Sequence, residues 1–215
     1  MVKKLIFIRH AEVARVHQGR YLGRKDVALC PVGVQQAHQL SRVLQRVSLQ
    51  APQLWVSPLR RCQQTAQILG FPQSTPRIFD DLREIDFGEF EGKRFSEIQA
   101  SYPEAVEQWA QFQPQFQFPQ GESLRQFLER MERVQAQILA EFKKKNSPSE
   151  LLLVTHGGVI STLLCLFLGL HPSQYLIFKI HKPSYSELSV YENGRGVLEK
   201  LNWGLPDFRS QKWRV

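Results

Sequence analysis

The sequence predicts an α/β protein, a three-layer sandwich in which helices cover both faces of a mostly parallel central sheet. Two observations support this fold class. Short apolar segments rich in β-branched or aromatic residues alternate along the chain with helical segments, as in parallel sheets covered on both faces. The length of 215 residues, 42% of them hydrophobic, suits one well-packed core. We therefore expect a single domain over 1–215.

Five segments are predicted as strands. Four are short runs of residues that favour strands: KLIFI at 4–8, QLWVS at 53–57, ELLLVT at 150–155 and ELSVY at 187–191. The fifth, VLEKLNW at 197–203, alternates between apolar and polar residues, which suits a strand at the edge of the sheet.

Four helices are predicted between the strands, over 31–47, 58–69, about 122–145 and 157–169. Pro31 and Pro58 stand where helices begin, and Gly70 stands where the second ends. The run Lys143–Lys145 follows the third helix, where basic residues complement the negative end of the helix dipole. The net charge of +8 is otherwise scattered, so we expect no nucleic-acid partner.

Other features bear on the location of the protein. The sequence has no run of about 18 apolar residues, so we expect no membrane span. The short apolar run after the first lysines is interrupted by Arg9 and does not fit a signal peptide. Cys30, Cys62 and Cys165 form no CxxC pair, which predicts reduced thiols in a cytoplasmic protein and no zinc site.

Ionisable residues gather where the predicted strands end. Arg9 and His10 follow LIFI, Arg60 follows LWV by a few residues, Glu84 follows the strand-like RIF, and His156 follows LLLVT. Because the carboxyl ends of parallel strands share one rim, these side chains can converge there. Arginine grips phosphate through a planar fork, histidine can act as a nucleophile, and glutamate can protonate a leaving oxygen.

The start of the last predicted helix adds to this pattern. Its N-terminus, directly after His156, offers backbone N–H donors to an anion. Gly157 lets the backbone approach a ligand closely.

Five motifs, in order and over nearly the whole chain, resemble those of the histidine phosphatase, or phosphoglycerate mutase-like, superfamily. RHAE at 9–12 is similar to the family's RHGE, SPLRRCQQTA at 57–66 to SxLxRxxxTA, and LREIDFGEFEG at 82–92 to LxExxxGxxEG. GESL at 121–124 and THGG at 155–158 are similar to GES and xHGG.

The resemblance implies a role for each residue of the rim. His10 would be the nucleophile and would form a phosphohistidine. Arg9, Arg60 and His156 would hold the phosphoryl oxygens, and Glu84 would be general acid and base. The family needs no metal or other cofactor. Arg61 is not expected to share the phosphate with Arg60, because each residue of a helix is turned by about 100° from the one before.

The sequence departs from the family pattern near the first motif. Ala11 replaces a glycine, and Val16 stands where the family has an asparagine. The following QGRYLGRKD resembles the family's substrate loop, which implies substrate contacts at Arg20 and Gly23. Arg20 or His17 is a candidate to replace the missing asparagine.

The segment between the third and fourth motifs, about 94–120, is expected to be an excursion that covers the substrate. Its part 111–120, QFQPQFQFPQ, is expected to be irregular. Trp109, Phe112, Phe116 and Phe118 either pack this excursion onto the domain or face the cleft, where they would suit a bulky apolar leaving group.

Together these features predict a metal-independent phosphatase that acts on a small phosphorylated metabolite. REIDFGEFEG is similar to the α-ribazole phosphatase and broad-specificity branch, so α-ribazole phosphate is a candidate substrate. The alternatives are a phosphoglycerate mutase, disfavoured by the lack of a polar pair after Glu84, and a catalytically weak regulatory protein. The assembly stays open between monomer and homodimer.

Overall fold

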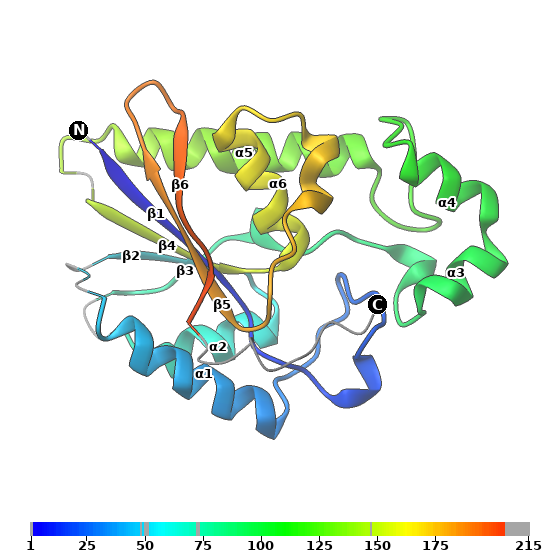
Figure 1. Ribbon diagram of the computed structural model, residues 1–215, viewed down its shortest axis with the longest axis horizontal. Helices are drawn as coiled ribbons and strands as arrows, with labels where there is room; N and C mark the ends of the chain where they lie inside the picture. Colours follow the sequence, from blue (N-terminus) through cyan, green and yellow to red (C-terminus); the bar gives the residue numbers. More distant parts are fainter. Residues whose placement is uncertain (1, 48, 50–51, 72–73, 147, 205–215) are drawn as a thin grey trace.

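A six-stranded sheet in the order β3-β2-β4-β1-β5-β6 forms the middle of the molecule (Figure 1). The computed structural model describes residues 2–47, 49, 52–71, 74–146 and 148–204, so the last eleven residues of the expected domain lie outside it. The strands are β1 (Lys3–Arg9), β2 (Gln53–Val56), β3 (Arg77–Ile78), β4 (Glu150–Thr155), β5 (Ser184–Val190) and β6 (Gly196–Trp203). All five predicted strands are present, and the short RIF segment supplies β3.

The sheet is parallel on one side and antiparallel on the other. β1, β2, β3 and β4 run parallel, whereas β5 is antiparallel to both β1 and β6. The mostly parallel sheet is therefore confirmed for its first four strands. The short link between β5 and β6, residues 191–195, is too short for a parallel crossover and makes these two strands a hairpin.

Helices cover both faces of this sheet (Figure 1). α1 (Pro31–Leu44) and α2 (Arg60–Leu69) lie on one face, and α5 (Leu124–Phe142) and α6 (Gly157–Leu168) lie on the other. The four predicted helices and the three-layer architecture are thus confirmed. Short 3₁₀ turns lie at η1 (Arg15–His17), η2 (Asp80–Leu82), η3 (Gly88–Phe90) and η4 (Pro172–Ile177). Among the described residues, no helix combines the length and the apolar character that crossing a membrane requires.

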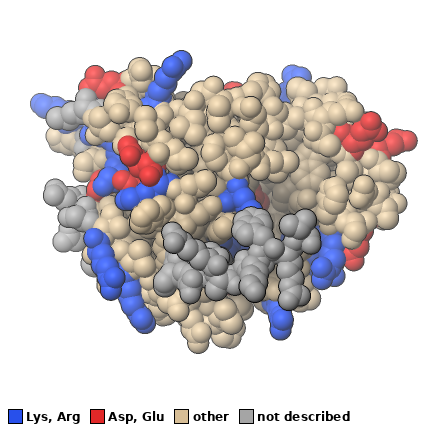
Figure 2. All heavy atoms as spheres, viewed as in Figure 1, with Lys and Arg blue, Asp and Glu red and all other residues tan. Residues whose placement is uncertain are grey.

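Basic side chains are spread over the surface. On the face in Figure 2, Lys and Arg atoms lie in several separate groups around the rim and near the centre. This distribution agrees with the scattered charge of the sequence.

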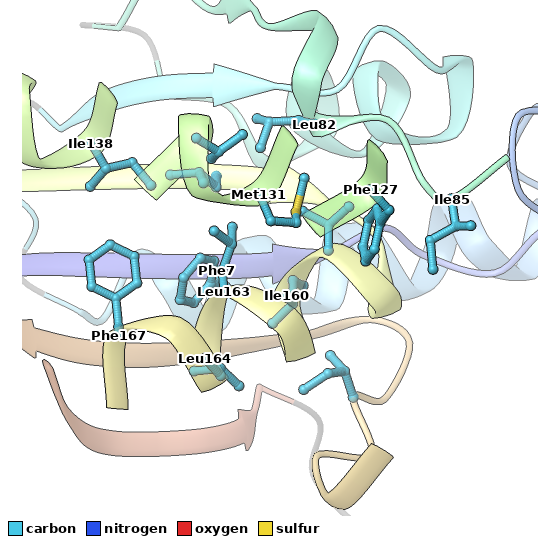
Figure 3. Close-up of a cluster of buried hydrophobic side chains, with 14 of the residues drawn as sticks. Phe7, Leu82, Ile85, Phe127, Met131, Ile138, Ile160, Leu163, Leu164 and Phe167 are labelled. Carbon is cyan, nitrogen blue, oxygen red and sulfur yellow. The ribbon is translucent and has the colours of Figure 1, made fainter. Parts of the chain in front are cut away.

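The core consists of two apolar layers separated by the sheet. Leu5 and Phe7 of β1 point toward α5 and α6, where Phe7 lies beside Met131 and Leu163 (Figure 3). Ile6 and Ile8, the alternate residues of β1, point toward α1 and α2. All four side chains are fully buried. β1 therefore needs apolar residues at each of the positions 5–8, which is why this part of its sequence shows no polar alternation.

The expected excursion is more ordered than its sequence indicates. It contains two further helices, α3 (Phe95–Ser101) and α4 (Pro103–Ala110), and then an irregular loop. Phe116 and Phe118 are buried in the same core layer as Phe7, and Trp109 packs edge-on against Phe118 with ring centroids 5.1 Å apart. Of the two alternatives, these contacts support packing onto the domain.

Candidate active site

The residues predicted at the rim come from neighbouring strands. The aligned pairs Ile8–Val154 and Arg9–Thr155 of β1 and β4 bring the next residues, His10 and His156, side by side. Their rings meet edge to face with centroids 5.2 Å apart. A cavity of about 260 Å³ opens here, lined by Arg9, His10, Val13, His17, Arg20, Tyr21, Leu22, Glu84, Phe87 and Lys182.

His10 has the protonation state that a nucleophile needs. Its Nδ1 lies 2.8 Å from the carbonyl oxygen of Ala11. A carbonyl can only accept a hydrogen bond, so Nδ1 carries the proton and the lone pair is on Nε2. Burial, followed by the positive charges of Arg61, Arg9 and Lys182, lowers the pKa of His10 well below its ordinary value. The imidazole is therefore neutral at pH 7.

α2 holds the turn that carries His10. The backbone N–H of Ala11 donates to Thr65 Oγ1 at 3.2 Å, and the same hydroxyl donates to the carbonyl of Arg61 at 2.7 Å. Thr65 is fully buried. The threonine of SPLRRCQQTA thus links the helix directly to the turn that carries His10.

His156 is completely buried and is not among the residues that line the cavity. Its Nε2 forms a hydrogen bond of 2.8 Å with Ser57 Oγ and lies 3.4 Å from Cys62 Sγ. Burial, then the charge of Arg61, lowers its pKa well below the ordinary value. A neutral His156, tied to the ends of β2 and α2, can serve as a hydrogen-bond partner in a dry site.

The structure does not bring Arg60 to this group. Its side chain is exposed, and its backbone N–H donates to Asp26 Oδ1 at 2.7 Å. Arg61 is fully buried instead, and its Nη1 and Nη2 donate to the carbonyls of Lys25 and Gly23 at 2.8 and 2.7 Å. The helical turn does separate the two arginines, as argued from the sequence, but it turns Arg61 inward.

A signal for Arg61 was present in the sequence. In SxLxRxxxTA the arginine is the fifth residue, and counting from Ser57 gives Arg61. The prediction for Arg60 placed the arginine one residue too early.

Arg9 is the second arginine of the site, and it is partly buried. Its Nη1 donates to the carbonyl of Ile180. The Nε atoms of Arg9 and Arg61 are both buried, and neither has a hydrogen-bond partner within the described part of the chain. Both guanidinium groups thus retain an N–H donor. Arg9 lines the cavity and could offer its donor to an anion there, whereas Arg61 is not among the lining residues.

Glu84 is fixed at the side of the cavity. It is 7% exposed, and its Oε2 accepts the N–H of Gly158 at 3.1 Å, in the first turn of α6. The sequence predicted that the N-terminus of this helix would offer its N–H groups to an anion. The N–H of Gly158 instead donates to the carboxylate of Glu84, a contact that the sequence did not predict. Oε1 accepts the N–H of Ile85 at 3.2 Å.

The two predicted glycines have supporting positions. A Cβ on Gly157 would stand 3.0 Å from Cζ of Arg9, so the glycine leaves room for that guanidinium. A Cβ on Gly23 would stand 2.0 Å from the Ile85 carbonyl oxygen, and the carbonyl of Gly23 is an acceptor for Arg61. Gly23 does not line the cavity in the structure.

η1 and the loop after it carry the residues near the position of the family asparagine. The side chain of Val16 is exposed, whereas His17 and Arg20 both line the cavity. Arg20 Nη1 also donates to the carbonyl of Gly92 at 2.7 Å and to Glu97 Oε2 at 2.9 Å. Both candidates for replacing the asparagine are thus beside the site.

Lys182 was missed by the sequence analysis. It lines the cavity, and its Nζ lies 3.8 Å from Glu12 Oε2. The lysine follows no predicted strand end, so no pattern marked it. Among the described residues, no three or more His, Cys, Asp or Glu side chains form a group that could hold a metal ion.

Comparison with known proteins agrees with this geometry. The model of the histidine phosphatase superfamily (branch 1) matches residues 5–204. The chain belongs to the histidine phosphatase superfamily. Phosphoserine phosphatase 1 of Hydrogenobacter thermophilus is 32% identical over 200 residues, which cover 93% of this chain and 92% of that protein. Adenosylcobalamin/alpha-ribazole phosphatase of Escherichia coli is 27% identical, over 87% and 90%.

Solved structures show the same fold. A putative alpha-ribazole-5'-P phosphatase from Escherichia coli superimposes on this histidine phosphatase with a TM-score of 0.82 and 27% identity, covering 94% of this chain and 97% of that one. Family, relatives and fold agree on a phosphatase of small phosphorylated metabolites.

Proposed function

We propose that this histidine phosphatase hydrolyses a phosphomonoester in two steps through a phosphohistidine on His10. In the first, Nε2 attacks phosphorus, the bond from phosphorus to the leaving oxygen breaks, and Glu84 as a carboxylic acid gives that oxygen a proton. In the second, the Glu84 carboxylate takes a proton from water as the water oxygen attacks phosphorus, which frees His10. The observation that carries the proposal is the buried, neutral His10 with its lone pair on Nε2.

Arg9, Arg61 and His156 hold the phosphoryl oxygens in this proposal. Within the described part of the chain, Arg61 donates two of its five N–H groups to carbonyls, and its buried Nε–H has no acceptor. Phosphoryl transfer is catalysed mostly by positioning and by neutralising charge on the equatorial oxygens. Two arginines can supply that charge, so we propose that no metal or other cofactor takes part.

We propose that the preferred substrate is a compact phosphomonoester with a second acidic group. The cavity of about 260 Å³ is small, and Arg20, Lys182 and His17 line it in addition to the groups assigned to the phosphate. These groups would pair with a second anionic group, such as the carboxylate of phosphoserine. The rings of Tyr21 and Phe87 also line it and favour α-ribazole phosphate as the second candidate.

A mutase would need polar groups beside Glu84 to hold a bisphosphate in two orientations. The following residue, Ile85, is 2% exposed and packs into the core. Hydrolysis is therefore expected without isomerisation of 3-phosphoglycerate.

The test is a panel of phosphoserine, α-ribazole phosphate, 3-phosphoglycerate and sugar phosphates, assayed for phosphate release with a chelator present. We expect the largest kcat/KM on phosphoserine. Isomerisation of 3-phosphoglycerate that requires 2,3-bisphosphoglycerate would establish the mutase instead. No turnover of any ester would leave the regulatory alternative.

We extend the proposal to compartment and assembly. Cys30, Cys62 and Cys165 are all free thiols, as is usual in the reducing cytoplasm. We propose a cytoplasmic enzyme without a nucleic-acid partner. Light scattering would decide between monomer and homodimer.

A further inference from the structure

Arg130 of α5 is a buried arginine that the two-step reaction does not use. It is 4% exposed and comes from the middle of the helix, 46 residues after Glu84 in the chain. Its guanidinium reaches the segment that carries Glu84. Nη1 donates to the carbonyls of Asp81 and Arg83 at 2.6 and 2.7 Å, and Nη2 donates to that of Glu84 at 3.5 Å.

Glu122 holds this guanidinium from the other side. Arg130 Nε donates to Glu122 Oε1 at 3.0 Å, and Nη2 donates to Oε2 at 2.8 Å, a bidentate pair between two buried side chains. Oε2 also accepts the N–H of Asp86 at 3.3 Å, and the carbonyl of Asp86 accepts the N–H of Glu122 at 3.0 Å. The GES segment thus pairs with the chain just after Glu84.

The hydrogen bonds of Arg130 are complete. An arginine has five N–H donors, and here they have five acceptors: three backbone carbonyls and the two oxygens of Glu122. Among the described residues, the buried Nε–H of Arg61 has no acceptor, whereas Arg130 has no donor left for a ligand. The carbonyl of Leu82, the remaining one in this segment, accepts from Thr155 Oγ1 at 2.7 Å. Every carbonyl from 81 to 84 is therefore held by a side chain.

We propose that Arg130, oriented by Glu122, is a positioning residue for Glu84. It fixes the backbone of 81–84 so that the carboxyl group of Glu84 stays at the N–H of Gly158, where it can reach the leaving oxygen. The inference rests on the proposed role of Glu84 as general acid. A lysine cannot replace Arg130, because an ammonium has three donors on one atom and cannot serve the five acceptors that surround the planar guanidinium.

Two substrates with different leaving groups distinguish a positioning role of Arg130 from a purely structural one. β-Glycerophosphate releases a strongly basic alkoxide that needs a proton, whereas p-nitrophenyl phosphate releases a weakly basic phenolate that does not. The parameter kcat/KM reports the steps up to departure of the leaving group, so hydrolysis of the phosphoenzyme does not enter. A displaced Glu84 should therefore lower kcat/KM for the first ester and spare the second.

The experiment compares Arg130→Lys, Glu122→Gln and Glu84→Gln on both esters. For Arg130→Lys we expect a loss of about 10–100-fold on β-glycerophosphate and less than about threefold on p-nitrophenyl phosphate. Glu122→Gln keeps Arg130 and should show the same difference between esters, less strongly. It tests the proposal even if Arg130→Lys does not fold. The matched control is Arg133→Lys on the same helix, since Arg133 is exposed and its Nε donates to the side chain of Asp81 at 3.4 Å.

Combined variants give the decisive result. Once Glu84 is glutamine, adding Arg130→Lys should not widen the difference between the two esters. Equal losses on both esters, or a lowered melting temperature with unchanged kcat/KM ratios, would show that Arg130 is only structural. If Glu84→Gln itself spared β-glycerophosphate, the role proposed for Glu84 would fall, and the positioning role with it.

Discussion

The neighbouring arginines of α2 give the sharpest test of the proposed phosphate site. Arg60→Ala removes an exposed side chain, whereas Arg61→Ala removes a fully buried guanidinium beside His10 and His156. Losing one preorganised charge-stabilising donor costs on the order of 10²–10³ in rate. We expect that loss in kcat/KM for Arg61→Ala and a change within about threefold for Arg60→Ala.

Stability has to be separated from binding in this comparison. Without Arg61, the buried carbonyl of Gly23 loses its donor, at a cost of about 1–3 kcal/mol. The assay therefore uses p-nitrophenyl phosphate well below the melting temperature of each variant, with inorganic phosphate as competitive inhibitor. The inhibition constant should rise for Arg61→Ala and stay constant for Arg60→Ala. The reverse order, or equal effects, would refute the assignment of Arg61.

Four further outcomes are expected. His10→Ala should abolish turnover while the fold remains, and acid quenching should trap an acid-labile, alkali-stable phosphate on the native enzyme only; an acid-stable adduct would argue against histidine. Treatment with a chelator should leave kcat unchanged, and a loss restored by one added divalent metal would contradict the proposed electrostatics. Burial and nearby arginines lower the pKa of His10 and His156. Below about pH 6.5 the unfolded chain therefore binds more protons than the native one. As the pH is lowered through this range, the free energy of unfolding falls by up to about 1.4 kcal/mol per pH unit for each histidine. Thermal melts at several pH values should show this slope, and His156→Gln should make it shallower. Phe118→Ala should cost about 3–5 kcal/mol of stability, and a raised KM at unchanged melting temperature would show instead that the ring serves the substrate.

The sequence predicted those parts of the fold that repeat a local pattern. The uninterrupted apolar residues 5–8 and 151–154 indicated strands buried on both faces, and both lie at the centre of the sheet. The direction of β5 was not predicted, because strand propensity carries no information on orientation. The helices α3 and α4 were not predicted either, because their amphipathic pattern is short and is interrupted at Tyr102.

The site shows a similar division. His10, Glu84 and His156 were predicted because each follows a strand or strand-like segment. Whether Arg60 or Arg61 points inward depends on where α2 begins, to within one residue. The predicted start of this helix, at Pro58, was not precise enough to choose between the two arginines. Lys182 reaches the cavity only through the path of the chain between η4 and β5, and tertiary structure of that kind leaves no periodic signal.

The alignment of β1 with β4 has a consequence for folding. Both strands carry apolar side chains on both faces, so a slip by one residue would exchange one apolar set for another and would cost mainly the fit of side-chain shapes. The polar ends distinguish the alternatives, because a slip would separate Arg9 from Thr155 and His10 from His156. The residues proposed for the chemistry therefore also select the register of the two central strands, so that a chain in which His10 is misplaced is at the same time a misfolded one.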